Sequence, residues 1–387
     1  MHVSVSYINE PDLIITTDSF IMNSKQTEIY EYWGYNYTNG ITIHKSVTKI
    51  KERAFENSDI TKIYFESNSA LLEIGDYAFK NCSRLFSFNL SYGNLNSLGF
   101  GTFSNCMNLT SVNFASNNFM IMGNAFENCT NLLNVSNMLN IPNKCFSGCT
   151  QIKNINIDEG SIHIGEKSFE NCYCLESINI PSSVETISEN SFLNCRNLKS
   201  IIFSSTNSLS EISYNSFRGC NSLQNISNFE SDNYKCIDNA LYYKNESKYY
   251  LIYHVINSSE NSLILNCNVI CSYSFTECNN IYNISILPDT VLIIEKYSFN
   301  KCLNLKYINF PYSVETVEFH SFNECPSICC PLIIENTKLD YIRMIINSGI
   351  PRNLILSCGV IQGSYNIKMI KLMNNKTPSL FWKHLSK

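Results

Sequence analysis

Cysteine is the residue in this sequence with the widest range of chemistry, since 18 of the 387 residues are cysteines. Cysteines in such number could form disulfides, bind a metal ion or supply a nucleophile. Their placement favours none of these, because ten of them follow a phenylalanine at a distance of three residues. The first copy of this pattern has Ser58 in the cysteine position, so a covalent partner is not required there. We therefore predict a ladder of free, buried thiols. It consists of Cys82, Cys106, Cys129, Cys149, Cys172, Cys195, Cys220, Cys278, Cys302 and Cys325.

Histidine and the standard catalytic motifs give no indication of a reactive site. The six histidines are dispersed, and none keeps the spacing to a cysteine pair that a structural zinc site requires. The sequence contains no glycine-rich phosphate loop, no Gly-x-Ser-x-Gly turn and no His-Glu-x-x-His helix. We therefore predict no catalytic residue, no metal site and no cofactor, and a protein that is not an enzyme.

The phenylalanine–cysteine pairs belong to a repeat that runs through most of the chain. Successive copies lie 20 to 25 residues apart, except for one step of 58 residues. A fixed period in this range indicates a leucine-rich solenoid. The copies begin at Phe55, Phe79, Phe103, Phe126, Phe146, Phe169, Phe192, Phe217, Phe275, Phe299 and Phe322.

Each copy must position its apolar side chains toward a common core. After Leu175, the apolar residues Ile178 and Ile180 alternate with period two, as on one side of a short strand. Phe192 and Cys195 then share one face of a short helical turn. The pattern predicts an α/β solenoid, a right-handed coil of about 12 levels with a parallel concave β-sheet, short helical turns and a cap at each end. The predicted core includes Phe79, Cys82, Phe126, Cys129, Phe169, Cys172, Phe192, Cys195, Phe299 and Cys302.

The regions that do not repeat define the predicted domain organisation. Residues 1–40 are expected to form an N-terminal cap, and residues 41–334 the repeat array. The step of 58 residues holds a tyrosine-rich inserted β-hairpin unit at about residues 226–270. Residues 335–387 are expected to form a C-terminal cap, with a helix from Leu339, and a tail.

One residue of each level lies between the two apolar strand positions, and it is expected to face outward from the concave sheet. These residues are nearly all polar and uncharged, which suits polar recognition better than phosphate binding. One interpretation is a solvent-facing ladder of hydrogen-bonded side chains. The other is a binding strip for a protein or a glycan, because concave solenoid faces are extended docking surfaces. The candidate binding face comprises Tyr64, Asn89, Asn113, Ser136, Asn156, Asn179, Ser285 and Asn309, and the same column includes Ile202 and Ser227.

Charge and hydropathy limit the classes of partner. The net charge of −5 argues against nucleic acid as a partner. No stretch approaches the 18 apolar residues of a membrane span, and the first residues lack the charged and apolar regions of a signal peptide. We therefore expect no integral membrane span, while the sequence itself leaves both the cell surface and the cytoplasm open as locations.

Four copies carry a resemblance to a known family: AFKNCSRL, AFENCTNL, SFENCYCLESINIPSSVETI and SFNKCLNLKYINFPYSVETV. They resemble the BspA-like leucine-rich repeat family over about residues 41–334, and the inserted ALYYKNESKYYLIYH segment is similar to a recurring element of that family. Its members are typically surface antigens or adhesins of oral bacteria and parasitic protists. The resemblance implies a non-enzymatic adhesion module that binds a host or matrix protein. The alternative is an intracellular leucine-rich repeat scaffold or adaptor that docks protein partners through the same face.

Overall fold

The computed structural model describes residues 12–34, 40–91, 93–115, 119–136, 138–213, 215–255 and 261–358. The chain forms two compact units, Met1–Asp238 (the first unit) and Asn239–Lys387 (the second unit). The division falls inside the stretch predicted as an inserted hairpin unit. The first 11 residues of the predicted N-terminal cap, and the predicted tail from residue 359 onward, lie outside the described residues.

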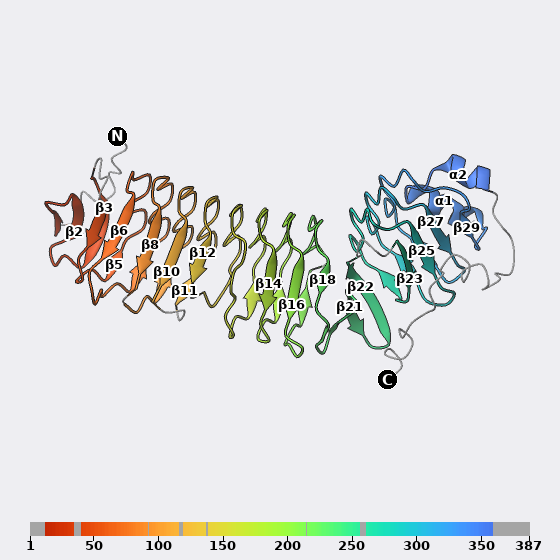
Figure 1. Cartoon of the computed structure of the whole chain (residues 1–387), viewed down its shortest axis with the longest axis horizontal. Helices are drawn as coiled ribbons and strands as arrows, with labels where there is room; N and C mark the ends of the chain where they lie inside the picture. Colours follow the sequence, from red (N-terminus) through yellow and green to blue (C-terminus); the bar gives the residue numbers. More distant parts are fainter. Residues whose placement is uncertain are drawn as a thin grey trace. The chain divides into compact units, whose positions relative to one another are not determined.

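The first unit confirms the predicted coil of parallel strands. Short parallel strands of two to four residues form the broad sheet, which is interrupted between β12 and β14, where residues 151–160 contain no strand. Within it, β8 (Ser87–Leu90) lies between β6 and β10 with parallel register. The levels follow one another along the red-to-green part of the ribbon (Figure 1). The other strands of the broad sheet are β4 (Ile41–Ile43), β6 (Lys62–Phe65), β10 (Ser111–Phe114), β12 (Asn134–Ser136), β14 (Ser177–Ile180), β16 (Ser200–Phe203) and β18 (Asn225–Ile226).

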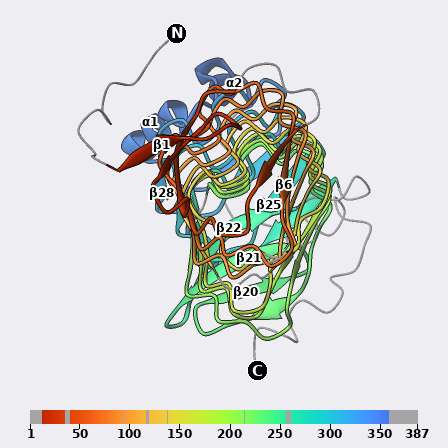
Figure 2. The ribbon, with the colours of Figure 1, turned by 90° about the vertical axis from the view of Figure 1, so that its left-hand side faces the viewer.

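The return segments form a second, narrow sheet, which is interrupted between β11 and β13, where Ile141 makes only an isolated bridge to Ile164. Its strands are only two residues long, and each buries one apolar residue, such as Ile74 or Leu98, against the core. Viewed along the coil, successive rungs of the first unit overlie one another (Figure 2). These strands are β5 (Lys49–Ile50), β7 (Glu73–Ile74), β9 (Ser97–Leu98), β11 (Met120–Ile121), β13 (His163–Ile164), β15 (Thr186–Ile187) and β17 (Glu211–Ile212). An antiparallel pair, β19 (Phe229–Glu230) and β20 (Tyr234–Ile237), ends the unit.

The third side of each level is a turn around the repeat phenylalanine and not the helical turn that we predicted. Each repeat phenylalanine except Phe217 lies between two residues with positive φ, for example Tyr77 (56°) and Asn81 (60°) around Phe79. Left-handed residues interrupt a right-handed helix, so the turn closes through single bonds such as the one from the Cys82 N–H to the Phe79 carbonyl (3.1 Å). The Phe79 N–H instead donates to Thr102 of the next level (2.8 Å).

The core consists of vertical files of identical side chains. From Phe55 to Phe217, neighbouring phenylalanine rings of the first unit are stacked with centroids 4.9 to 5.6 Å apart. All ten residues predicted as core are fully buried. The ten repeat cysteines are free, as predicted. Nine of them donate their thiol proton to the phenylalanine carbonyl of the preceding level, at 2.9 to 3.2 Å. Cysteine therefore supplies a small apolar group and a hydrogen-bond donor at once.

Residues before the repeats extend the narrow sheet. β1 (Leu13–Ile15), β2 (Phe20–Asn23) and β3 (Glu28–Tyr32) pair antiparallel, and β3 pairs parallel with β5. Tyr32 occupies the phenylalanine position of this level, because its ring lies 5.3 Å from that of Phe55 and its N–H bonds the Ala54 carbonyl.

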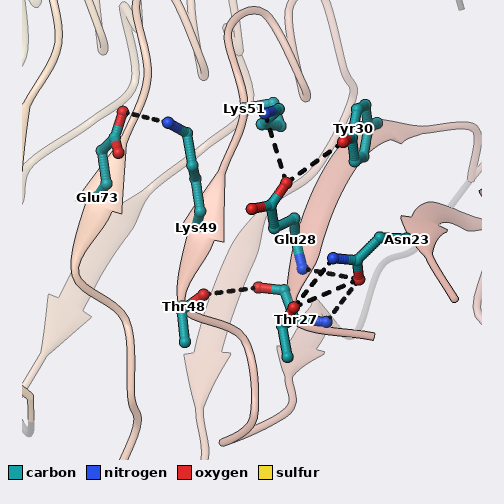
Figure 3. A network of polar contacts seen from close by, with 8 residues as sticks. All are labelled: Asn23, Thr27, Glu28, Tyr30, Thr48, Lys49, Lys51 and Glu73. Atoms are coloured by element: carbon teal, nitrogen blue, oxygen red, sulfur yellow. Dashed lines mark hydrogen bonds and ion pairs between the residues drawn. The ribbon is translucent and has the colours of Figure 1, made fainter. Parts of the chain in front are cut away.

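Polar side chains hold this first level in register (Figure 3). The Asn23 carboxamide accepts the Thr27 N–H (2.8 Å) at the turn before β3. Glu28 pairs with Lys51 (3.4 Å) and accepts the hydroxyl of Tyr30 (3.3 Å). These pairs are part-exposed, so each contributes little stability, and their role is to align β3 with β5.

The second unit repeats the same plan. β21 (Ala240–Asn245) and β22 (Lys248–His254) form an antiparallel hairpin, and β22 pairs parallel with β24 (Val269–Ile270). β26 (Ile293–Ile294) and β28 (Thr316–Val317) continue that sheet. The broad sheet of this unit consists of β23 (Ser262–Leu265), β25 (Asn283–Ile286), β27 (Tyr307–Phe310) and β29 (Ile333–Ile334).

Two helices follow the last level of the second unit. α1 (Leu339–Asn347) buries Tyr341 and Ile345, and α2 (Arg352–Cys358) buries Ile355. Cys330 and Cys358 form a disulfide with Cα atoms 5.4 Å apart, which ties α2 to the last level. The sequence did not indicate this pair.

His254 occupies the phenylalanine position at the start of the second unit. Its ring stacks on Phe275 with centroids 5.8 Å apart, and its backbone N–H donates to Ser274, as the phenylalanines do elsewhere. Burial lowers the pKa of His254 from 6.5 to about 4. The unfolded chain therefore binds a proton between these pH values that the folded chain excludes.

We expect the second unit to lose about 2 kcal/mol of unfolding free energy between pH 8 and pH 5 because of His254. His254→Phe should remove this part of the pH dependence, as measured by denaturant unfolding at several pH values. His320→Phe is the matched control, since His320 is exposed. An unchanged pH profile in the His254→Phe variant would contradict the assignment.

Candidate partner-binding face

The outward residues of β8, β10 and β12 form a row along the broad sheet of the first unit. In β8, Phe88 and Leu90 are buried and Asn89 between them is exposed, because side chains alternate along a strand. Asn89 lies opposite Asn113 of β10, and Asn113 lies opposite Ser136 of β12. Parallel pairing without register shifts therefore places these three residues one above another, whereas Asn156 lies in a segment that is not a strand.

Five of the predicted residues present exposed side chains on this face. Tyr64 is 49% exposed, and Asn89, Asn113, Asn156 and Asn179 are also exposed. The Asn113 carboxamide donates to Asn89 Oδ1 (3.1 Å), so neighbouring levels are linked in part as a ladder. The side chain of Ser136 lies outside the described part of the chain. We call the exposed residues of this row the outward row.

The structure does not place Ser285 and Asn309 of the second unit in an equivalent setting. Ser285 is only 7% exposed, since all four residues of β25 are buried. The Asn309 carboxamide bonds both the N–H and the carbonyl of Ile286, each at 2.8 Å. Its polar groups thus extend the backbone ladder at the end of β25 and do not point to a partner.

Sequence reasoning missed the apolar residues beside the outward row. Phe86 and Leu133 precede β8 and β12 and are 53% and 46% exposed. The periodic pattern does not include them, because they follow the buried leucine of each copy. The available signal was composition, because residues 85–143 contain a single charged residue, Glu127.

On the narrow sheet, two hydroxyl side chains lie around one histidine. On the narrow sheet, His163 Nδ1 bonds the Thr186 hydroxyl, and the Ser188 hydroxyl lies 3.5 Å from His163 Nε2. Partial burial lowers the pKa of His163. Among the described residues, no group of three or more His, Cys, Asp or Glu side chains could hold a metal ion. In the same part of the chain, no helix has the length and apolar character needed to cross a bilayer.

Burial affects the ionisation of several repeat thiols. Desolvation raises the pKa of Cys82, Cys149 and Cys195 well above the ordinary thiol value. The thiolate is the reactive form of cysteine, so these three residues serve packing and hydrogen bonding. The hydrogen bond with Cys302 instead lowers the pKa of Cys325. The chemistry available to the outward row is therefore noncovalent recognition by amides, hydroxyls and a few apolar side chains.

Comparison with known proteins agrees with this architecture. A family model described as "BspA type Leucine rich repeat region (6 copies)" matches residues 15–133, 134–248 and 268–344. A leucine-rich cell surface protein of Faecalibacterium prausnitzii is similar in structure, with 21% identity, a TM-score of 0.59, and 95% of this chain and 99% of that chain covered. A leucine-rich repeat protein of Bacteroides ovatus has 19% identity and a TM-score of 0.43, covering 92% of this chain and 99% of that chain. No curated protein matches the sequence.

Proposed function

Because the chain belongs to the BspA-type leucine-rich repeat family, we propose that it is a non-enzymatic adhesion module that binds a protein partner on the broad sheet of its first unit. Solenoids of this kind act as repeat modules for interaction, since each level adds surface to one continuous face. The partner class that we propose is a host or matrix protein, as for a surface antigen.

The outward row is the observation that carries this proposal. Tyr64, Asn89, Asn113 and Asn179 are exposed on strands whose backbones are paired to their neighbours, and the exposed Asn156 lies between β12 and β14, outside any strand. A site on rigid strands loses little conformational freedom when a partner binds. The row is uncharged and rich in amides, which suits hydrogen bonding to a partner at physiological salt.

Two observations support a location at the cell surface. The structural neighbour from Faecalibacterium prausnitzii bears the name of a cell surface protein. The Cys330–Cys358 disulfide is of a kind that persists in oxidising compartments and is rare in the cytosol. An antibody should therefore label intact, unpermeabilised cells. Labelling that requires permeabilisation would refute the surface proposal.

An intracellular adaptor that uses the same face is the second candidate, and the 16 free cysteines favour it. The buried thiols would stay reduced in either compartment, so their count does not separate the two functions. The terminal disulfide does separate them. Alkylation of cells before lysis should leave Cys330 and Cys358 unmodified in a surface protein and modified in a cytosolic one.

Changing Asn113, Asn156 and Asn179 together to Arg should abolish partner binding, because three long cations would cover the outward row. Each substituted side chain is exposed, so the free energy of unfolding should change by less than about 0.5 kcal/mol per site. Binding to matrix preparations and denaturant unfolding are the two measurements.

A matched triple Arg variant on the other sheet is the control. Asn96, Asn140 and Ser210 are polar residues that precede core positions of the narrow sheet. Their substitution should leave binding intact. If the variant with Arg at positions 113, 156 and 179 still binds the partner, the site lies on another face.

A further inference from the structure

One section of the first unit is almost free of charge. Residues 85–143 contain one charged residue, Glu127, whereas 16% of the whole chain is charged. Glu127 lies on the phenylalanine turn and accepts the Asn124 carboxamide (2.7 Å), away from the broad sheet. The broad face over β8, β10 and β12 therefore carries no formal charge. We call it the neutral section.

Charged side chains begin again at both ends of the neutral section. Lys62 and Glu66 flank the exposed Tyr64 on the level before it. On later levels, Glu176 and Lys199 form an ion pair at 3.2 Å. The lack of charge thus distinguishes this section from the rest of the same face and favours a neutral ligand, although Arg84 and Lys62 stand at its edge near Phe86.

A row of apolar and hydroxyl side chains borders the neutral section where its strands begin. The Thr110 N–H and hydroxyl both donate to the Phe86 carbonyl, at 2.9 and 3.0 Å. The Leu133 N–H donates to the Thr110 carbonyl at 2.9 Å. Phe86, Thr110 and Leu133 are therefore held on successive levels, with the Phe86 ring more than half exposed.

Amides of the outward row stand three residues after this apolar border on the same levels, Asn89 after Phe86 and Asn113 after Thr110. Asn89 Oδ1 accepts both the Asn113 carboxamide (3.1 Å) and the Ser91 hydroxyl (2.6 Å). These bonds fix the side chain of Asn89 and direct its own amide hydrogens away from Asn113 and Ser91. An exposed ring and ordered amides on the same levels suit molecules that have both hydroxyl groups and apolar faces.

The spacing of the levels distinguishes between neutral ligands. Adjacent parallel strands are about 4.8 Å apart, whereas an extended peptide repeats its side-chain direction only every ~6.6 Å. An extended peptide running along the stack would therefore lose register with the amides after one level. A pyranose ring is close to one level spacing in length, and it offers hydroxyls at its rim and C–H groups on its faces.

We propose that the neutral section binds a neutral oligosaccharide chain along the stack, with one sugar ring packed on Phe86 and hydroxyls bonded by Asn89 and Asn113. This inference rests on the proposed function and deepens it, since the chain would be the glycan of the bound partner. Binding of an uncharged ligand should not weaken with salt.

Isothermal titration of the intact protein with cellohexaose, laminarihexaose and maltohexaose tests the proposal. At least one should bind with an affinity that stays constant between about 0.05 and 0.5 M salt. Phe86→Ala should weaken binding about tenfold or more, as expected for loss of an aromatic anchor. Phe86→Trp should retain binding, and Phe319→Ala, which removes an equally exposed ring of the second unit, should have no effect.

Three results would overturn the glycan inference: none of the three oligosaccharides binds, a heparin hexasaccharide binds in preference, or Phe86→Ala binds as the wild type. A separate experiment distinguishes failure of the glycan inference from failure of the proposed adhesion function. If the partner still binds after enzymatic removal of its glycans, and the triple Arg variant of the outward row loses it, the adhesion function stands and the glycan inference fails.

Discussion

Phe169→Ala should lower the free energy of unfolding by about 3–5 kcal/mol, which is the usual cost of removing a fully buried aromatic side chain. Phe169 is fully buried, and its ring stacks between Phe146 (5.5 Å) and Phe192 (5.2 Å). The substitution leaves a cavity between two levels and removes both ring contacts. Since a solenoid level contacts only its neighbours, adjacent levels cannot compensate. Urea unfolding of the wild type and the variant provides the measurement.

Phe86→Ala is the matched control for this loss. The same chemical change at a half-exposed ring should alter stability by less than about 0.5 kcal/mol. Equal losses in the two variants would contradict the stacked phenylalanine file as the centre of the core.

Cys195→Asp should destabilise the first unit by about 3–5 kcal/mol, because it buries an uncompensated charge. Cys195 is fully buried, and its thiol donates to the Phe169 carbonyl (3.1 Å). An aspartate would turn a donor into a carboxylate that faces a carbonyl oxygen. Burial raises the pKa of such a carboxyl above its unfolded value, so the variant should lose stability as pH rises. Its deficit should be smaller at pH 5 than at pH 8.

Cys195→Ala and Cys195→Ser separate charge from size and hydrogen bonding. The alanine variant loses the thiol contacts and should cost about 1–2 kcal/mol. The serine variant keeps a donor to the Phe169 carbonyl. A Cys195→Asp variant as stable as Cys195→Ala, at every pH, would show that this position is open to water.

The architecture was predictable because every level buries the same atoms. The positions of Phe169 and Cys172 recur in every copy, with a period set by the number of residues in one level. The sequence pattern therefore indicates the coil. The prediction of a helical turn was wrong, and the sequence itself contains the reason. Asn81 and Gly148 stand two residues after their phenylalanines, and both types tolerate the left-handed conformation observed there.

Single departures from the pattern could not be predicted. His254 fills a phenylalanine position through its tertiary setting, without a cysteine three residues later. Likewise, the disulfide between Cys330 and Cys358 depends on how α2 packs at the end of the second unit. Neither property is encoded in local spacing.

From the sequence, the candidate face could be predicted only through the alternation of inward and outward side chains along each strand. Period two places Asn89 outward between Phe88 and Leu90, and the structure agrees. It cannot show that the Asn309 amide bonds the backbone of Ile286, because that depends on where β25 ends. The neutral section can be recognised from the distribution of charged residues in the sequence, which does not follow the repeat period.

Site-specific photo-crosslinking tests the central claim most directly. A benzophenone amino acid at position 113, on the broad sheet, should crosslink the partner on matrix or host-cell preparations, and the same probe at position 96, beside the narrow sheet, should not. Crosslinks from position 96 alone would contradict partner binding on the broad sheet of the first unit.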